Sequence, residues 1–193
     1  TLFHKEKYHL LRLTLDGTEA VSEKFTDPTE AEQAAVMCKG AAVTCTSVTK
    51  EQKKEQPPKL YDLTTLQREA NRLFGYTAKQ TLDYAQSLYE KKLLTYPRTD
   101  SRYLTSDMEE TASCVIHLAA KLPPFDGCTN FFPLVEVMIS DKDVSDHHAI
   151  IPTMEIEKAD LKLLPVGERN LLLLVCCKLL CASAEPYVYE AVT

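Results

Sequence analysis

The stretch Tyr61–Glu90 reads YDLTTLQREANRLFGYTAKQTLDYAQSLYE and carries strong helix signals. Apolar residues recur in its first half at the spacing of one helix face: Leu66, Ala70, Leu73 and Phe74. Gly75 follows at the position where a helix commonly ends. Thr77 then begins a Thr-x-x-Gln capping box, which marks the start of a helix. The stretch therefore predicts two successive helices.

Further helices are predicted on the C-terminal side of this stretch. Ser106 and Glu109 form a second possible capping box, which predicts a helix to about Lys121. An apolar run predicts a last helix over residues 166–183, and residues 134–139 have the composition of a short strand. The middle of the chain is thus expected to be mainly helical.

The two ends of the chain have strand-like character. Residues 8–15 and 41–48 are predicted strands, and Asp27 followed by proline predicts a helix start between them. Residues 50–59, KEQKKEQPPK, have the composition of a solvated linker, and residues 187–193 form a strand-like tail. The expected fold class is α+β, with a mainly helical domain flanked by β segments.

Composition narrows the classes of protein. The 193 residues include 45% hydrophobic residues, and no apolar run approaches the roughly 18 residues that cross a bilayer, so no membrane partner is expected. The seven cysteines form no Cys-x-x-Cys pair, which disfavours zinc and indicates the reducing cytoplasm. The net charge of −6 disfavours nucleic acid unless basic residues gather on a local face. Because the chain starts without Met, we expect it to be part of a longer protein.

The stretch LLTYPRTDSRYLT, residues 93–105, places a phenol among basic and hydroxyl groups. A phenol attacks phosphate poorly unless its anion is stabilised, and phosphoryl transfer needs positive charge at the non-bridging oxygens. Tyr96 has Arg98 two residues away, whose planar fork can bind phosphate at two points. Thr99 and Ser101 offer hydroxyl donors to a DNA backbone. Taken alone, the pattern is a weak signal, because the chain has nine tyrosines and most tyrosines are packed or surface residues.

A second polar motif, SDHHAIIPT, covers residues 145–153. Its two histidines can simply stand at the start of a helix or loop, with no chemical role. His147 or His148 can also donate a proton or a hydrogen bond to phosphate, because imidazole titrates near neutrality. Both interpretations stay open at the level of the residues.

Together, these three stretches resemble the type IA DNA topoisomerases, nearer to the topoisomerase III branch. In that family a tyrosine attacks a phosphodiester of single-stranded DNA and keeps the 5′ phosphate, a second strand passes through the gap, and the 3′ hydroxyl reseals the break without ATP. The resemblance assigns the nucleophile to Tyr96, the phosphate-positioning arginine to Arg98, and the histidine near the phosphate to His147. It implies that four more residues contact DNA: Gln67, Thr99, Ser101 and Arg102.

The resemblance also implies a domain plan. Residues 59–185 would form the helical domain with the catalytic tyrosine, residues 1–58 part of a β arch with a linker, and residues 186–193 a return strand into the arch. Mg²⁺ would be bound by a separate acidic domain of the same polypeptide, because no such motif occurs here. Asp141-Lys142-Asp143 has the spacing of a metal-binding pair but the context of a solvated turn. The chain alone is therefore expected to be inactive.

Two other functions compete with this interpretation. A non-catalytic helical module for single-stranded nucleic acid would use Tyr96 to stack on a base and Arg98 to hold a phosphate. A phosphotyrosine recombinase or rolling-circle nuclease would also use a tyrosine, but its dispersed Arg-His-x-x-Arg set or its His-x-His triad is missing from the sequence.

Overall fold

Residues 5–15, 17–127 and 132–193 are described by a computed structural model of the chain. The chain divides into two units, one of residues 1–50 with 192–193 and one of residues 51–191. Asp16 and Gly17 predict a turn in the sequence, and Asp16 lies outside the described residues. Within the described ranges, no helix has the length and apolar character to cross a membrane.

The smaller unit contains a hairpin and one helix. Strands β1 (Arg12–Leu15) and β2 (Thr18–Val21) pair antiparallel. Helix α1 (Pro28–Cys38) starts as predicted, because the side chain of Asp27 accepts a hydrogen bond from the Thr29 amide at 2.8 Å. The prediction of a strand at residues 41–48 is wrong, since this stretch has no regular structure and no pairing partner within the described residues.

Among its described residues, the larger unit has four α-helices: α2 (Leu63–Phe74), α3 (Ala78–Glu90), α4 (Glu109–Ala120) and α5 (Val166–Ala182). The capping box of Thr77 and Gln80 forms at the start of α3 as predicted, with both reciprocal bonds present. Gly75 ends α2 with a φ of 71°, a left-handed conformation that favours glycine. Local chemistry therefore sets the boundary between α2 and α3.

Two local predictions in this unit are wrong. Residues Ser106–Met108 form a 3-10 turn before α4, and the Ser106 amide donates to Asp141 Oδ1 at 2.7 Å, so no capping box forms there. Val135–Met138 is a 3-10 helix, although a strand was expected at residues 134–139. In both places a hydrogen bond to a distant residue accompanies the unexpected backbone conformation. Ser106 bonds to Asp141, and the Leu134 amide donates to the Ser183 carbonyl at 2.7 Å.

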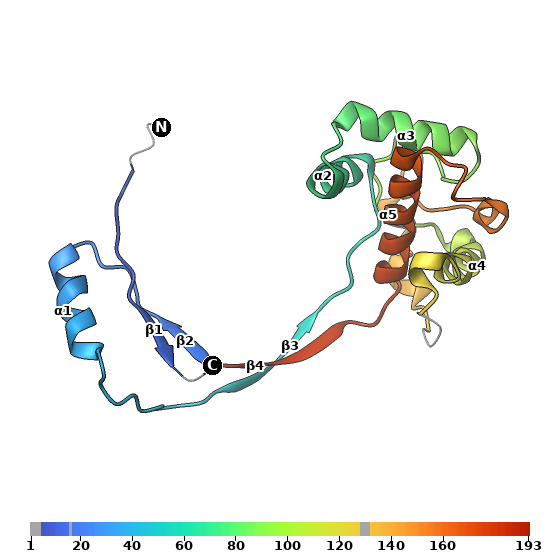
Figure 1. Ribbon diagram of the computed structural model, residues 1–193. Coiled ribbons are helices and arrows are strands. Elements are labelled where there is room, and N and C mark those ends of the chain that lie inside the picture. The colour runs from blue at the N-terminus through green and yellow to red at the C-terminus, as the bar shows by residue number, and fades with distance from the viewer. Residues whose placement is uncertain (1–4, 16, 128–131) are drawn as a thin grey trace. The chain divides into compact units, whose positions relative to one another are not determined.

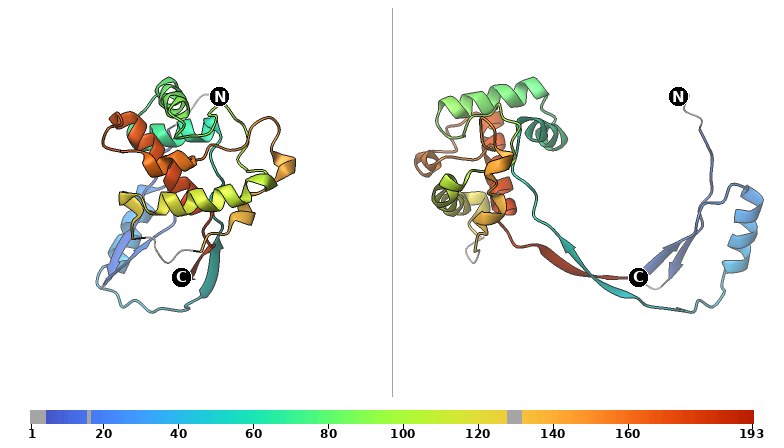
Figure 2. Two further views of the ribbon diagram at one scale, coloured as in Figure 1. Left: turned by 90° about the vertical axis from the view of Figure 1, so that its right-hand side faces the viewer. Right: turned by 180° about the vertical axis from the view of Figure 1, so that it is seen from behind.

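The two chain segments that lead into and out of the helices pair with each other. Strand β3 (Lys50–Glu55) lies beside β4 (Tyr187–Val192), as Figures 1 and 2 show. Thr49 and Thr193 exchange backbone hydrogen bonds of 2.8 and 3.0 Å, the pattern of an antiparallel pair. The expected solvated linker is therefore wrong for residues 50–55, which form a strand, although all of them are exposed.

The core of the larger unit surrounds α5. This helix packs against α3 and α4, and α2 packs against α3 (Figure 1). Among its large, fully buried side chains are Leu60, Leu66, Leu88, Leu104, Ile116, Ile150 and Leu171. The buried set includes residues from the predicted helices and from the two loops that carry the tyrosine and histidine motifs, so the core fixes these loops in place.

Candidate active site

The tyrosine and histidine motifs lie side by side. Leu94 and Pro152 form an isolated antiparallel bridge. Next to it, the Thr95 amide donates to the Ile151 carbonyl at 3.0 Å, and the Ile151 amide donates to Thr95 Oγ1 at 3.0 Å. These bonds hold the two loops in register.

The third motif stretch joins the same cluster. The Ile150 amide donates to the Tyr61 carbonyl at 2.8 Å, and the Leu63 amide donates to the Thr99 carbonyl at 3.0 Å. The short segment before α2 therefore lies against both loops. All three stretches that carried the family resemblance meet in one region.

The ring of Tyr96 contacts two other rings. The centroids of Tyr96 and His147 are 4.5 Å apart with 49° between the ring planes. Tyr89, at the end of α3, lies edge-on to Tyr96 at 5.5 Å and 74°. Tyr96 is half-buried and His147 is exposed, so the contact stands at the surface. Reasoning from the sequence missed Tyr89, because only the fold brings it to Tyr96.

The guanidinium of Arg98 is available to a ligand. Arg98 is exposed, and its side chain makes no hydrogen bond or ion pair with any residue that the structure describes. Pro97, between Arg98 and Tyr96, is buried and restrains the backbone there. The arrangement offers a fixed phenol and a free cation two residues apart, a pair suited to a phosphate group.

Thr99 and Ser101 lie inside the protein, with exposed fractions of 8% and 4%. Thr99 Oγ1 donates to the His147 carbonyl at 2.9 Å, and Ser101 Oγ donates to the Asp143 carbonyl at 2.9 Å. Their hydroxyl groups thus tie the tyrosine loop to the histidine loop. Direct DNA contact by either residue stays a prediction; what the structure describes is a positioning role.

Gln67 and Arg102 both hydrogen-bond to backbone. Gln67 Nε2 donates to the Ala78 carbonyl at 3.0 Å and so links α2 to the start of α3. Arg102 Nε donates to the Leu60 carbonyl at 3.1 Å. In the described part of the chain, no hydrogen bond or ion pair joins either side chain to Tyr96 or His147. Their role in DNA binding also stays a prediction.

The described carboxylates form no cluster of the kind that holds a metal ion. Within residues 5–15, 17–127 and 132–193, no group of three or more His, Cys, Asp or Glu side chains is arranged to hold a metal. Asp141 accepts from the Ser106 amide at 2.7 Å, and Asp143 Oδ2 accepts from Ser140 Oγ at 2.6 Å. Both carboxylates of the Asp-Lys-Asp turn are thus engaged locally.

Comparison with known proteins decides the family. A family model described as DNA topoisomerase matches residues 1–193, the whole chain. The chain belongs to the DNA topoisomerase family. The topoisomerase III-like resemblance of its motifs is confirmed by curated relatives named DNA topoisomerase 3.

These topoisomerase relatives come from bacteria. The protein of Shouchella clausii is 40% identical over 175 residues, which cover 81% of this chain and 24% of the relative. The protein of Bacillus licheniformis is 36% identical over 206 residues, covering 97% of this chain and 27% of the relative. The chain therefore spans about a quarter of the length of these topoisomerases.

A solved structure shares the fold of this topoisomerase chain. Full-length topoisomerase I from Thermotoga maritima matches 97% of the chain, and 31% of its own length, with a TM-score of 0.66 and 23% sequence identity. The mixed arrangement of helices and small sheets is thus a known topoisomerase fold.

Proposed function

We propose that this chain is the tyrosine-bearing part of a longer type IA topoisomerase, which cleaves and rejoins single-stranded DNA to let a second strand pass. The observation that carries the proposal is the contact between the rings of Tyr96 and His147, 4.5 Å apart; Arg98, two residues after Tyr96, is exposed and has no ion-pair partner among the described residues. Family membership supports the same activity.

The cleavage step is a transesterification. The Tyr96 hydroxyl loses its proton and its oxygen bonds to the phosphorus, while the bond from phosphorus to the 3′ oxygen breaks. The 3′ oxygen leaves with a proton as a hydroxyl, and the 5′ phosphate stays on the tyrosine. The phosphotyrosine ester conserves the energy of the broken phosphodiester bond, so the reverse attack by the 3′ hydroxyl reseals the strand without ATP.

Three side chains have separate roles in this step. Tyr96 is the nucleophile, and Arg98 binds the non-bridging oxygens, whose charge grows in the transition state. His147 donates a hydrogen bond or a proton at the same phosphate. Thr99 and Ser101 position the loops through their bonds to the carbonyls of His147 and Asp143.

The rest of the machinery belongs to other parts of the longer protein in this proposal. Residues 59–185 form the catalytic-tyrosine domain, while residues 1–58 and 186–193 contribute to an arch that lets it move. Mg²⁺ is held by a separate acidic domain, and the chain by itself does not cleave DNA. The free thiols of the described cysteines support a cytoplasmic location.

The test is a Tyr96→Phe substitution in the full-length protein. The variant keeps the ring and loses only the nucleophilic oxygen, so we expect no covalent adduct with a labelled single-stranded oligonucleotide on denaturing gels and nearly unchanged binding. Tyr89→Phe is the matched control, because it removes the same atom from the neighbouring ring and should leave the adduct intact.

An adduct with the Tyr96 variant would place the nucleophile elsewhere. Binding without any adduct in the wild type would favour a non-catalytic binding module.

A further inference from the structure

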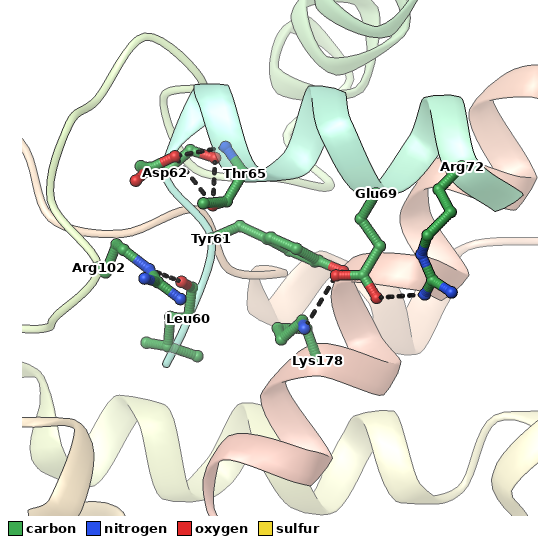
Figure 3. Close-up of polar contacts among 8 residues, drawn as sticks. All are labelled: Leu60, Tyr61, Asp62, Thr65, Glu69, Arg72, Arg102 and Lys178. Atoms are coloured by element: carbon green, nitrogen blue, oxygen red, sulfur yellow. Dashed lines mark hydrogen bonds and ion pairs between the residues drawn. The ribbon is translucent and has the colours of Figure 1, made fainter. Parts of the chain in front are cut away.

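A basic depression lies between α2, α5 and the loop that carries Tyr96. It has a volume of about 410 Å³ and is open to solvent. Its charged lining comprises Arg68, Glu69, Arg72, Arg102 and Lys178. Figure 3 shows Lys178 reaching from α5 toward Glu69, with Arg72 on the far side and Arg102 beside the backbone of Leu60. The lining therefore holds four cationic side chains and one carboxylate, in a chain with a net charge of −6.

The carboxylate is fully engaged by its neighbours. Glu69 Oε2 accepts from the Tyr61 hydroxyl at 2.7 Å and pairs with Lys178 Nζ at 3.0 Å, while Oε1 pairs with Arg72 at 3.4 Å. Burial on its own raises the pKa of the Glu69 carboxyl, but the Tyr61 hydrogen bond and the Lys178 charge outweigh it and hold the pKa below its ordinary value. Glu69 is thus an anion at neutral pH, and it offsets one positive charge.

The other two cations, Arg68 and Arg102, have no anionic partner among the described residues. Arg68 is exposed and makes no hydrogen bond or ion pair among the described residues. Arg102 uses only Nε, on the Leu60 carbonyl, which leaves the two terminal nitrogens of its guanidinium unbonded within the same residues. Exposed arginines gathered around an open hollow are the groups that bind phosphate through paired N–H donors.

Hydrogen bonds link the lining of the depression to the candidate active site. Tyr61, a lining residue, belongs to the segment 60–63, which bonds to the tyrosine loop through Arg102 and through the Thr99 carbonyl. The Tyr61 carbonyl bonds to Ile150 of the histidine motif. We propose that the depression binds a backbone phosphate of the same single strand that Tyr96 attacks, as a subsite away from the scissile phosphate. This inference rests on the proposed function and adds Arg68 and Arg72 to the residues that bind DNA.

A single strand fits the depression because its backbone is flexible. It can turn from the scissile phosphate into a hollow on the neighbouring helix, whereas a duplex bends only at a considerable free-energy cost. The basic lining also accounts for how an acidic chain contacts DNA, since binding depends on the local charge at the contact and not on the sum over the molecule.

Binding of a fluorescein-labelled oligothymidylate to the full-length protein tests the subsite, measured by anisotropy between about 50 and 200 mM KCl. We expect Arg68→Glu to weaken binding roughly tenfold, the loss of one charge-assisted contact. The slope of log affinity against log salt should become shallower by about 0.7 for each lost phosphate contact. Arg68→Lys should keep most of the affinity. Arg68 has no described partner, so the fold should survive each change.

Lys162→Glu is the matched control, because it makes the same change in net charge at an exposed site. Lys162 precedes the first residue of α5, Val166, whereas Lys178 of the depression lies near the other end of this helix. At the usual rise per residue, Val166 and Lys178 are about 18 Å apart along the helix axis. Equal losses of affinity in the Arg68→Glu and Lys162→Glu variants would overturn the subsite. Unchanged binding by Arg68→Glu, with a normal Tyr96 adduct, would reject the subsite and keep the proposed function. Absence of the adduct in the wild type would reject the proposed function, whatever the affinities.

Discussion

The ring of Tyr96 lies 4.5 Å from the ring of His147, although the two residues belong to different motif stretches. The contact depends on backbone bonds between the two loops and on the hydroxyl of Thr99, which donates to the His147 carbonyl. In the proposed mechanism, an imidazole held against the phenol is in place to act on the phosphate that the phenol attacks.

Replacing His147 by Ala in the full-length protein should lower the cleavage rate less than the loss of Tyr96 does. The change removes the hydrogen bond or proton that the imidazole gives to the phosphate, so the pH profile of the rate should change as well. Single-turnover cleavage at several pH values is the measurement. A rate that falls with an unchanged pH profile would assign His147 a purely structural role, as a packing partner of Tyr96.

Replacing Arg98 by Ala should slow cleavage by about 3–4 kcal/mol of transition-state stabilisation and weaken DNA binding much less. The guanidinium is exposed and unpaired among the described residues, so its removal leaves no buried group unsatisfied. Arg98→Lys keeps the charge without the two-point fork and should fall between wild type and Arg98→Ala. Cleavage and binding constants, measured on one oligonucleotide, separate the two effects. Equal losses would make Arg98 an ordinary phosphate contact.

Gly167→Ala should destabilise the protein by about 1–3 kcal/mol, although alanine is normally the better helix former. A Cβ at position 167 would lie 2.4 Å from Cζ of Tyr84. That ring packs edge-on against Tyr76, with centroids 5.3 Å apart, so it cannot move freely. Urea unfolding gives the free-energy change, and a Tyr84→Leu background should reduce the cost. A more stable Gly167→Ala variant would contradict the steric argument.

Alkylation of Cys181 by iodoacetamide should rise steeply through pH 6. A hydrogen bond from Cys177, one turn earlier on α5, lowers the pKa of Cys181 to about 6, and the same bond raises the pKa of Cys177. Since the thiolate is the reactive form, the rate follows its fraction. Cys177→Ala should move the midpoint to higher pH, as read by mass spectrometry of the modified peptide. Identical midpoints in the two proteins would exclude the shared hydrogen bond.

Those parts of the fold that depend on neighbours in sequence could be predicted. The boundary at Gly75 and the capping box at Thr77 are set within a few residues, and both formed as expected. Strand β3 was missed because its six residues are all exposed and charged or polar, and its partner β4 stands at the other end of the chain. Pairing with a distant segment leaves no periodic signal in such a sequence.

The candidate site, too, could be predicted only in part from the sequence. The motifs pointed to Tyr96, Arg98 and His147, but only the fold brings the rings of Tyr96 and His147 together. The burial of Thr99 and Ser101 was not foreseen, because a small hydroxyl side chain suits a surface and a packed loop equally well. The basic depression could not be predicted either, since Arg68 and Lys178 line it from two helices that are far apart in the sequence.

The pairing of β3 with β4 has a mechanical consequence. The strand ends that lie farthest along the chain from the helices are paired at Thr49 and Thr193. A force that pulls these two ends apart therefore breaks the hydrogen bonds of the strand pair one after another. Each such bond contributes about 0.5–1.5 kcal/mol net, and the exposed side chains of β3 add no buried packing to resist the load. The helices should therefore keep their structure while the strand pair opens under a small tension.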